Sequence, residues 1–143
     1  KFIFEASKID QSINYYFKLR DSEYDNWRKN YPFLLNTKNF TIIDNNERHL
    51  YELIGESSYI ATTFSTVIYE ALSLKRNVII IKDKDFAYVK NLVSISLVEL
   101  SESINEFVKK VKTNQQQQAI RKSFFYKPNS LENFNVAINR IIN

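Results

Sequence analysis

Short apolar runs alternate with amphipathic stretches along most of this sequence. Runs rich in β-branched and aromatic residues are typical of buried strands, whereas apolar residues that recur about every three to four positions are typical of helices. On this basis we expect strands at residues 13–19, 40–44, 58–62, 77–82 and 93–100. The run NVIIIK at residues 77–82 is apolar on both faces, which is typical of a strand in the middle of a parallel sheet.

The segments that separate the predicted strands have helical patterns. In residues 45–57, the apolar side chains share one helix face, and Gly55 supplies a C-terminal stop. Further helices are predicted at residues 20–32, 65–75, 85–92, 102–112, 115–124 and 130–143. Residues 1–8 fit either the end of a helix or a strand.

This alternation of strands and helices defines a fold class. Strands and helices at this spacing require right-handed βαβ crossovers and a parallel sheet that helices cover on both sides. The sequence therefore predicts a Rossmann-like α/β fold, without revealing the order of the strands. At 143 residues, the whole chain (1–143) has the length of a single domain. Because it begins with Lys1 and contains no Met, we expect it to be a fragment of something longer or a processed product.

The composition excludes several kinds of site. The chain has no Cys, so disulfides, thiolate nucleophiles and Cys-based metal sites are excluded. The single His, His49, is too few for a multi-His metal site, and a Ser-His-Asp triad would have to use it. We therefore expect no metal. No apolar run approaches the roughly 18 residues that crossing a bilayer requires.

The net charge of +4 does not by itself indicate a nucleic-acid partner. Lys and Arg are interspersed with acidic residues, and only residues 74–77 and 108–112 hold basic clusters. We therefore expect no binding to nucleic acid. A mildly basic surface does suit a phosphorylated ligand.

Four hydroxyl side chains lie where the third predicted strand leads into a helix, and they belong to Thr62, Thr63, Ser65 and Thr66. In open α/β sheets, ligands bind outside the carboxyl ends of the strands. A helix that begins near Ser65 would aim unpaired N–H groups and the positive end of its dipole at that place, where such groups bind anions. Ser65 and Thr66 would add hydroxyl donors from the helix, and Thr62 and Thr63 would approach from the strand end.

One carboxylate, Glu70, follows on the same helix face as Thr66, about one turn further on. Glu70 is too far from Ser65 to close a capping box, which needs its acid at position 68. A carboxylate accepts hydrogen bonds from two hydroxyls, so Glu70 suits the ribose diol of a nucleotide whose phosphates lie at the helix tip. The simpler interpretation is that Ser65 is only an N-cap and that Glu70 is a solvated acid that complements the helix dipole.

The order FTIIDNNERHLYELIGESSYIATTFSTVIYEALSLKRNVIII, beginning at residue 40, resembles the C-terminal half of GT-B glycosyltransferases that build bacterial surface polymers. It is similar to capsule polysaccharide transferases and to glycerophosphotransferases that assemble teichoic-acid-type chains, and the resemblance spans about residues 13–82. Its most specific part is a strand of the type s-x-Y-I-A-T, then F-S-T-x-x-x-E-A and a buried strand. By this resemblance Ser65 and Thr66 contact the phosphates of the donor, and Glu70 binds its ribose.

Two stretches depart from this family pattern. Such proteins usually carry K-x-H-P-x-E after the first strand, where this chain reads KLRDSE, with Arg20 and Asp21 in place of His and Pro. Since a guanidinium is a good bidentate partner for phosphate, we expect Arg20 to contact the donor. The G-K-P that usually precedes the buried strand reads KRN at residues 75–77, which changes the tight turn there.

The resemblance implies one half of a GT-B architecture, namely the donor-binding domain of a metal-independent transferase whose other half is an N-terminal Rossmann-like domain. It implies a nucleotide-sugar or CDP-polyol donor as substrate, no separate cofactor, and a polysaccharide or lipid-linked acceptor. The implied location is the cytoplasm, with peripheral association at the inner face of the cell membrane. No residue of this chain is identified as the catalytic base, and we expect the isolated domain to be inactive.

Two other interpretations stay open. A nucleotide-sugar 2-epimerase uses a similar half-domain with Ser and Glu near the same corner, whereas a non-catalytic module of a polysaccharide assembly would need no donor. Among the remaining side chains, His49 is expected to be a surface or half-buried residue rather than to reach the ligand crevice. Phe86 and Tyr88 are expected in the core, with stacking on a nucleobase as the alternative.

Overall fold

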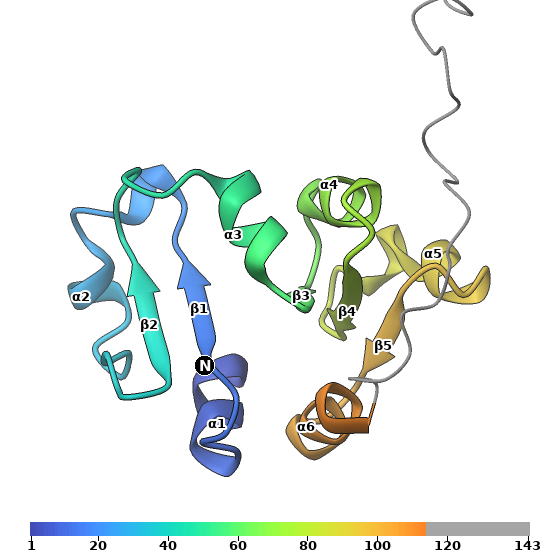
Figure 1. Cartoon of the computed structure of the whole chain (residues 1–143), viewed down its shortest axis with the longest axis horizontal. Coiled ribbons are helices and arrows are strands. Elements are labelled where there is room, and N and C mark those ends of the chain that lie inside the picture. Colours follow the sequence, from blue (N-terminus) through green and yellow to red (C-terminus); the bar gives the residue numbers. More distant parts are fainter. Residues whose placement is uncertain (114–143) are drawn as a thin grey trace, which may run out of the picture.

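The computed structural model describes residues 1–113, in which helices alternate with short parallel strands (Figure 1). The helices predicted at residues 115–124 and 130–143 lie outside the described residues. The strands are β1 (Tyr15–Lys18), β2 (Phe40–Ile43), β3 (Tyr59–Thr62), β4 (Asn77–Ile81) and β5 (Glu99–Ser101). The α-helices are α1 (Phe2–Ile9), α2 (Trp27–Asn30), α3 (Leu50–Glu56), α4 (Val67–Ser73), α5 (Lys90–Ser94) and α6 (Ile104–Thr113), and the 3₁₀ turns are η1 (Asp21–Glu23) and η2 (Phe86–Tyr88).

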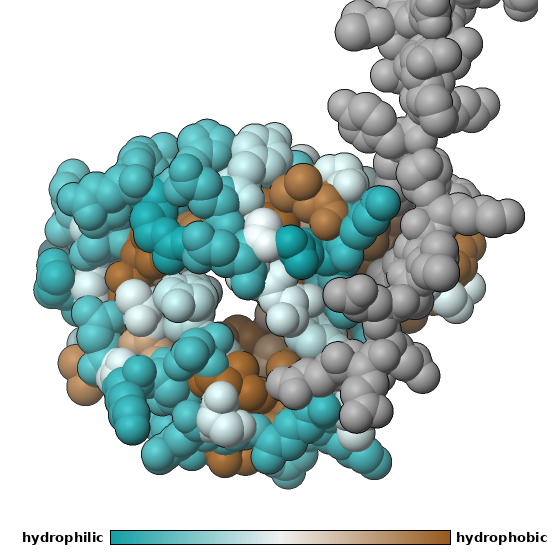
Figure 2. All heavy atoms as spheres, in the orientation of Figure 1, coloured by the Kyte–Doolittle hydropathy of each residue, from teal (hydrophilic) through white to brown (hydrophobic). Residues whose placement is uncertain are grey.

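The strands form two parallel sheets, one of order β1-β2 and one of order β3-β4-β5. Every pair is parallel, which confirms the predicted α/β class. The prediction of one continuous sheet was wrong for the described residues, because no backbone ladder joins β1 to β3. Instead, the β3 side chains of Tyr59 and Ala61 pack against the apolar cluster beneath β1. Figure 2 shows the surface hollowed near the middle of the molecule, between the two sheets.

The prediction of a strand over residues 93–100 was also wrong for most of its length. Helix α5 runs to Ser94, and β5 begins only at Glu99. Between them, Ser96 adopts a left-handed conformation with φ 57°, its N–H donates to Val93 C=O at 2.9 Å, and the next N–H donates to Leu92 C=O at 3.0 Å. These two bonds define a Schellman motif, which ends a helix. The alternating pattern was therefore produced by a helix end and not by a strand.

A second Schellman motif ends α4, at the place where the sequence has KRN. Lys75 has φ 58°, its N–H donates to Leu72 C=O at 3.0 Å, and the N–H of Arg76 donates to Ala71 C=O at 2.9 Å. The turn that leads into β4 therefore keeps the left-handed geometry that glycine favours, although the residue is a lysine. A side chain with a Cβ is strained there.

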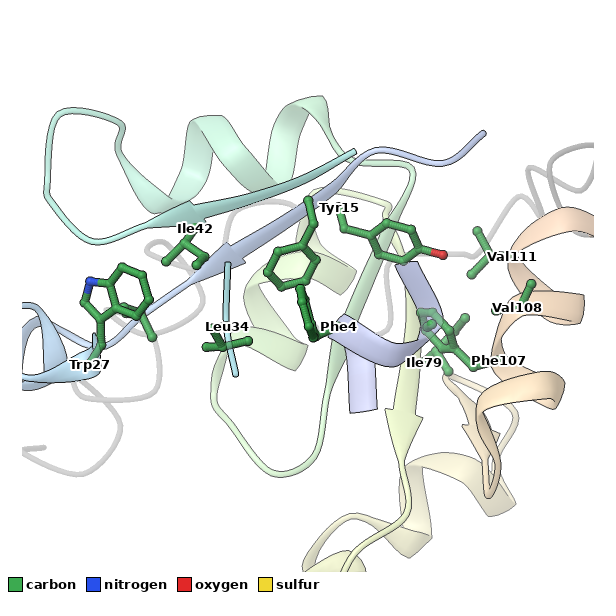
Figure 3. Close-up of a cluster of buried hydrophobic side chains, with 12 residues drawn as sticks. Phe4, Tyr15, Trp27, Leu34, Ile42, Ile79, Phe107, Val108 and Val111 are labelled. Atoms are coloured by element: carbon green, nitrogen blue, oxygen red, sulfur yellow. The ribbon is translucent and has the colours of Figure 1, made fainter. Parts of the chain in front are cut away.

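The core consists of two apolar clusters that meet at β4. Ile79 points into the first cluster together with Phe4 of α1 and Phe107 of α6 (Figure 3). This cluster also contains Phe40 of β2. Val78 and Ile80 alternate with Ile79 and point into the second cluster, which lies among α3, α4 and α5. The residues at positions 78–80 are at most 1% exposed, so β4 is buried on both faces, as its sequence predicts.

Helices α1 and α6 close the first cluster from one side. Phe2 and Phe107 meet edge to face with their ring centroids 5.8 Å apart. Lys112 Nζ lies 2.9 Å from Asp10 Oδ2, while Asp10 Oδ1 accepts hydrogen bonds from the N–H and the hydroxyl of Ser12 at 2.9 and 2.6 Å. These hydrogen bonds, first that from the Ser12 hydroxyl and then that from Lys112, lower the pKa of Asp10 to about 2. The ion pair therefore ties the first described helix to the last one.

The strained turn at Lys75 leads to a first prediction. The substitution Lys75→Gly should raise the free energy of unfolding by about 0.5–1 kcal/mol, because glycine adopts the left-handed conformation without strain. Lys75→Ala is the matched control, since it removes the charge but keeps the Cβ. Urea unfolding followed by circular dichroism measures both. Equal stability of the glycine and alanine variants would refute this account of the turn.

The Asp10–Lys112 pair predicts how stability depends on pH. Because the pKa of Asp10 is lower in the folded chain than in the unfolded chain, its contribution is complete above about pH 4 and is lost as pH falls toward about 2. Asp10→Asn should therefore be less stable than the wild type at pH 7, and this difference should shrink between about pH 4 and pH 2. Urea unfolding at several pH values measures it. Glu5→Gln, which breaks an exposed pair with Lys8, is the control, and its effect on stability should be much smaller than that of Asp10→Asn at pH 7.

Candidate functional site

The predicted hydroxyl residues lie together at the carboxyl end of β3. Thr62 is the last residue of β3, and Thr63, Ser65 and Thr66 form the turn that leads to α4. Because β4 is a parallel neighbour of β3, the segment that follows Ile81 leaves the sheet at the same edge. Thr62, Thr63 and Ser65 are half-buried and Thr66 is exposed. The structure therefore gathers the hydroxyls where ligands of α/β sheets bind.

Helix α4 begins at Val67, two residues later than predicted, and Ser65 accepts hydrogen bonds from its first N–H groups. Ser65 Oγ accepts a hydrogen bond from the N–H of Val67 at 3.3 Å, and its carbonyl accepts one from the N–H of Ile68 at 3.3 Å. The Ser65 hydroxyl thus serves the start of α4 as a cap would, from one residue before the N-cap position, which Thr66 occupies. A hydroxyl that accepts in this way still has its own hydrogen to donate. Capping therefore leaves Ser65 able to bind an anion.

Several backbone donors at this turn have no acceptor in the described part of the chain. The N–H groups of Phe64, Ser65 and Thr66 make no hydrogen bond there, whereas those of Val67 and Ile68 are occupied by Ser65. Thr66 already has helical dihedral angles, with φ −61° and ψ −21°. The turn therefore has up to three N–H groups and the hydroxyl hydrogens of Ser65 and Thr66 without an acceptor in residues 1–113, a combination that suits an anion.

Glu70 lies one turn beyond Thr66 on α4 and is half-buried. Its backbone carbonyl accepts hydrogen bonds from the N–H of Leu74 at 3.1 Å and from the Ser73 hydroxyl at 2.7 Å. Its carboxylate has no hydrogen bond or salt bridge with any described residue. The Glu70 carboxylate is therefore not committed to holding the fold together and remains able to accept hydrogen bonds from a ligand.

Arg20 comes from the other sheet. It follows β1, is exposed, and precedes η1, where its backbone N–H donates to Glu23 Oε2 at 3.0 Å. Among the described residues no hydrogen bond or salt bridge involves its guanidinium, and none connects it to the turn before α4. The structure thus does not bring the Arg20 side chain into contact with the hydroxyls.

His49 has a structural role at the start of α3. Its Nδ1 accepts a hydrogen bond from the N–H of Tyr51 at 3.3 Å, and its own N–H donates to Glu52 Oε2 at 3.3 Å, so it closes a capping box. The imidazole is exposed and stacks on the Tyr51 ring, with centroids 5.3 Å apart. The expectation of a surface position for His49 is therefore confirmed.

The aromatic residues after β4 have different positions. Phe86 packs against the second cluster, as predicted, whereas the prediction that Tyr88 lies in the core was wrong, because Tyr88 is 71% exposed. The Tyr88 ring contacts Phe64, which is 50% exposed, at a centroid distance of 5.1 Å and an interplanar angle of 35°. Sequence analysis assigned no role to Phe64. The available signal was its position: Phe64 lies between two hydroxyl residues, Thr63 and Ser65, in the turn after the predicted strand, and not within that strand.

An open cavity of about 460 Å³ lies elsewhere, along β5 and the start of α6. Its lining residues are Val93, Ser96, Val98, Glu99, Leu100, Glu102, Glu106 and Lys110. Lys110 Nζ pairs with Glu106 at 2.9 Å and donates to the carbonyl of Leu100, and Glu106 accepts from the N–H of Glu102 at 2.8 Å. The bond from Glu102 and that from Lys110 lower the pKa of Glu106. These charged groups serve each other and the edge of β5, and none of the predicted site residues lines the cavity.

Within residues 1–113, no three side chains of the His, Cys, Asp or Glu type come together as a metal site would require. The same residues contain no helix with the length and apolar character needed to cross a bilayer. A scan against protein-family models and searches of curated proteins and of solved structures found no significant match to this chain. Function must therefore be inferred from the turn between β3 and α4 and from the pattern of the sequence around it.

Proposed function

We propose that this chain is the donor-binding domain, Rossmann-like in fold, of a GT-B-type transferase that moves a sugar or a polyol phosphate from a nucleotide donor to a bacterial surface polymer. One observation carries the proposal. At the carboxyl end of β3, unpaired N–H groups and hydroxyls lie at the tip of α4, with an uncommitted carboxylate about one turn away. The resemblance of residues 13–82 to capsule and teichoic-acid transferases supports the same assignment.

The roles of the residues follow from their chemistry. The N–H groups of Ser65 and Thr66 and their hydroxyls would hold the donor's phosphates, while Glu70 would accept hydrogen bonds from the ribose hydroxyls. The same donors would stabilise the charge that builds on the departing nucleotide as the transferred group leaves. Thr62 and Thr63 would line the strand side of the site, and Arg20 would reach the phosphates from the end of β1. The acceptor and the catalytic base would come from an N-terminal domain.

Titration of the 143-residue chain with CDP, UDP, CMP and CDP-glycerol tests the proposal. Ser65→Ala and Glu70→Gln should each weaken the binding of CDP about tenfold or more, because each removes charge-assisted hydrogen bonds, from the Ser65 hydroxyl to the phosphates and from the ribose hydroxyls to the Glu70 carboxylate. Ser94→Ala and Glu47→Gln are the matched controls, since these exposed residues lie outside the site. Thermal unfolding checks that loss of the Ser65 cap has not unfolded the chain.

Pyrophosphate and 2′-deoxy-CDP separate the two halves of the site. Pyrophosphate should bind less tightly to Ser65→Ala but no less tightly to Glu70→Gln, because Glu70 is assigned to the sugar. The deoxynucleotide should bind wild type and Glu70→Gln with more similar affinities than CDP does. Wild-type protein that binds none of the nucleotides would refute the donor site and favour a non-catalytic interaction module. Turnover of a UDP-sugar without an acceptor by the longer protein would favour the epimerase.

A further inference from the structure

Two exposed aromatic rings stand at the same edge of the sheet as the proposed phosphate site. Phe64 follows β3 and immediately precedes Ser65, while Tyr88 ends η2, the turn that follows β4. Since β3 and β4 are adjacent parallel strands, the two loops leave the sheet side by side. Their rings touch, with centroids 5.1 Å apart.

Phe64 and Tyr88 do not contribute to the buried core, so core packing does not explain why aromatic residues occupy these positions. Tyr88 is 71% exposed and Phe64 is 50% exposed, although the neighbouring Phe86 and Val89 pack in the second cluster. The only ring contact recorded for Tyr88 in the described chain is that with Phe64, and its hydroxyl makes no hydrogen bond there. Two touching rings are too small an area to serve as the core of a stable protein interface, which buries roughly 800 Å² on each side. They do match the size of one flat ring.

On the basis of the proposed function, we propose that Phe64 and Tyr88 form a stacking platform for the nucleobase of the donor. A base presents a π-face that stacks on aromatic side chains whatever its identity. The Phe64 and Tyr88 rings already contact each other, so the base would lie on the solvent-facing side of Tyr88, with Phe64 supporting that ring from behind. The phosphates, held next to Phe64 at Ser65 and Thr66, would fix where along the platform the base lies.

The platform has a consequence for selectivity. Stacking tolerates every base, and Tyr88 and Phe64 offer at most one hydroxyl with which to read a base edge. The two rings should therefore give little preference between cytosine and uracil, and we expect CDP and UDP to bind with affinities within about threefold of each other. Replacement of Tyr88 should weaken both nucleotides by the same factor.

Leucine substitutions test the platform. In the 143-residue chain, Tyr88→Leu should weaken the binding of CDP and UDP about tenfold, and Phe64→Leu should do so to a smaller extent, whereas pyrophosphate should bind each variant as it binds the wild type. Tyr88→Phe should retain the affinity, because stacking needs the ring and not the hydroxyl. Tyr51→Leu is the matched control: Tyr51 is a tyrosine of similar accessibility, 52% exposed, on α3.

A tryptophan at position 88 gives a direct readout. The only native tryptophan, Trp27, is buried in α2 and donates to Asp44 at 2.8 Å, so its emission supplies a constant background. The emission of Tyr88→Trp should be quenched by CDP and by cytidine at high concentration, and not by pyrophosphate.

The possible outcomes separate this platform from the donor site itself. If wild type binds no nucleotide, the proposed function fails and the platform fails with it. If wild type binds CDP and Tyr88→Leu binds it equally well, the donor site stands and the platform is refuted. The platform is also refuted if Tyr88→Leu weakens a nucleotide-sugar while CDP binding is unchanged, because the ring would then contact the sugar.

Discussion

Burial of both faces of β4 is the constraint on which the rest of the described structure depends. Ile79 fills the cluster shared with α1, β2 and α6, while Val78 and Ile80 fill the cluster shared with α3, α4 and α5. Each of these side chains, when fully buried, contributes about 1.5–3 kcal/mol. Because no ladder joins β1 to β3, the apolar cluster around Ile79 is one of the contacts that hold the two sheets together. A polar residue at position 79 would therefore disturb both sheets at once.

The candidate site inherits its geometry from this strand. The pairing of β3 with β4 fixes the position of Thr62, the last residue of β3, opposite Ile80. Burial of Ile68 and Ala71 in the second cluster fixes the position of α4. The groups assigned to a ligand are then the ones that the fold does not use: the N–H groups of the turn and the carboxylate of Glu70. A preorganised anion site needs polar groups that make no bonds within the protein and a rigid, buried scaffold that holds them in place.

The sequence could predict most of the elements, because their patterns are local. The apolar run at residues 77–82 and the hydroxyls that end at Thr66 were recognised correctly, since burial on two faces and a strand-to-helix corner both leave short signatures. The strand expected at 93–100 begins only at Glu99, because a serine in a left-handed helix end has no signature as clear as glycine. Whether β1 and β3 pair, and whether Tyr88 points outward, depends on contacts between distant segments, which no local pattern records.

The outer edge of β5 has a further consequence for how this domain meets its neighbours. The C=O of Ser101 accepts a hydrogen bond from the N–H of Lys82, the residue that follows β4, so the backbone groups of Leu100 point away from the sheet. On that outer side, Lys110 donates to the carbonyl of Leu100, and Glu106 accepts from the N–H of Glu102. An edge strand with free backbone groups invites another chain to add a strand. Here one helix blocks that addition with an ammonium group and a carboxylate, so the three-stranded sheet is closed to intermolecular β-augmentation on this side. On the β5 side, contacts with another chain would therefore be made by side chains and loops.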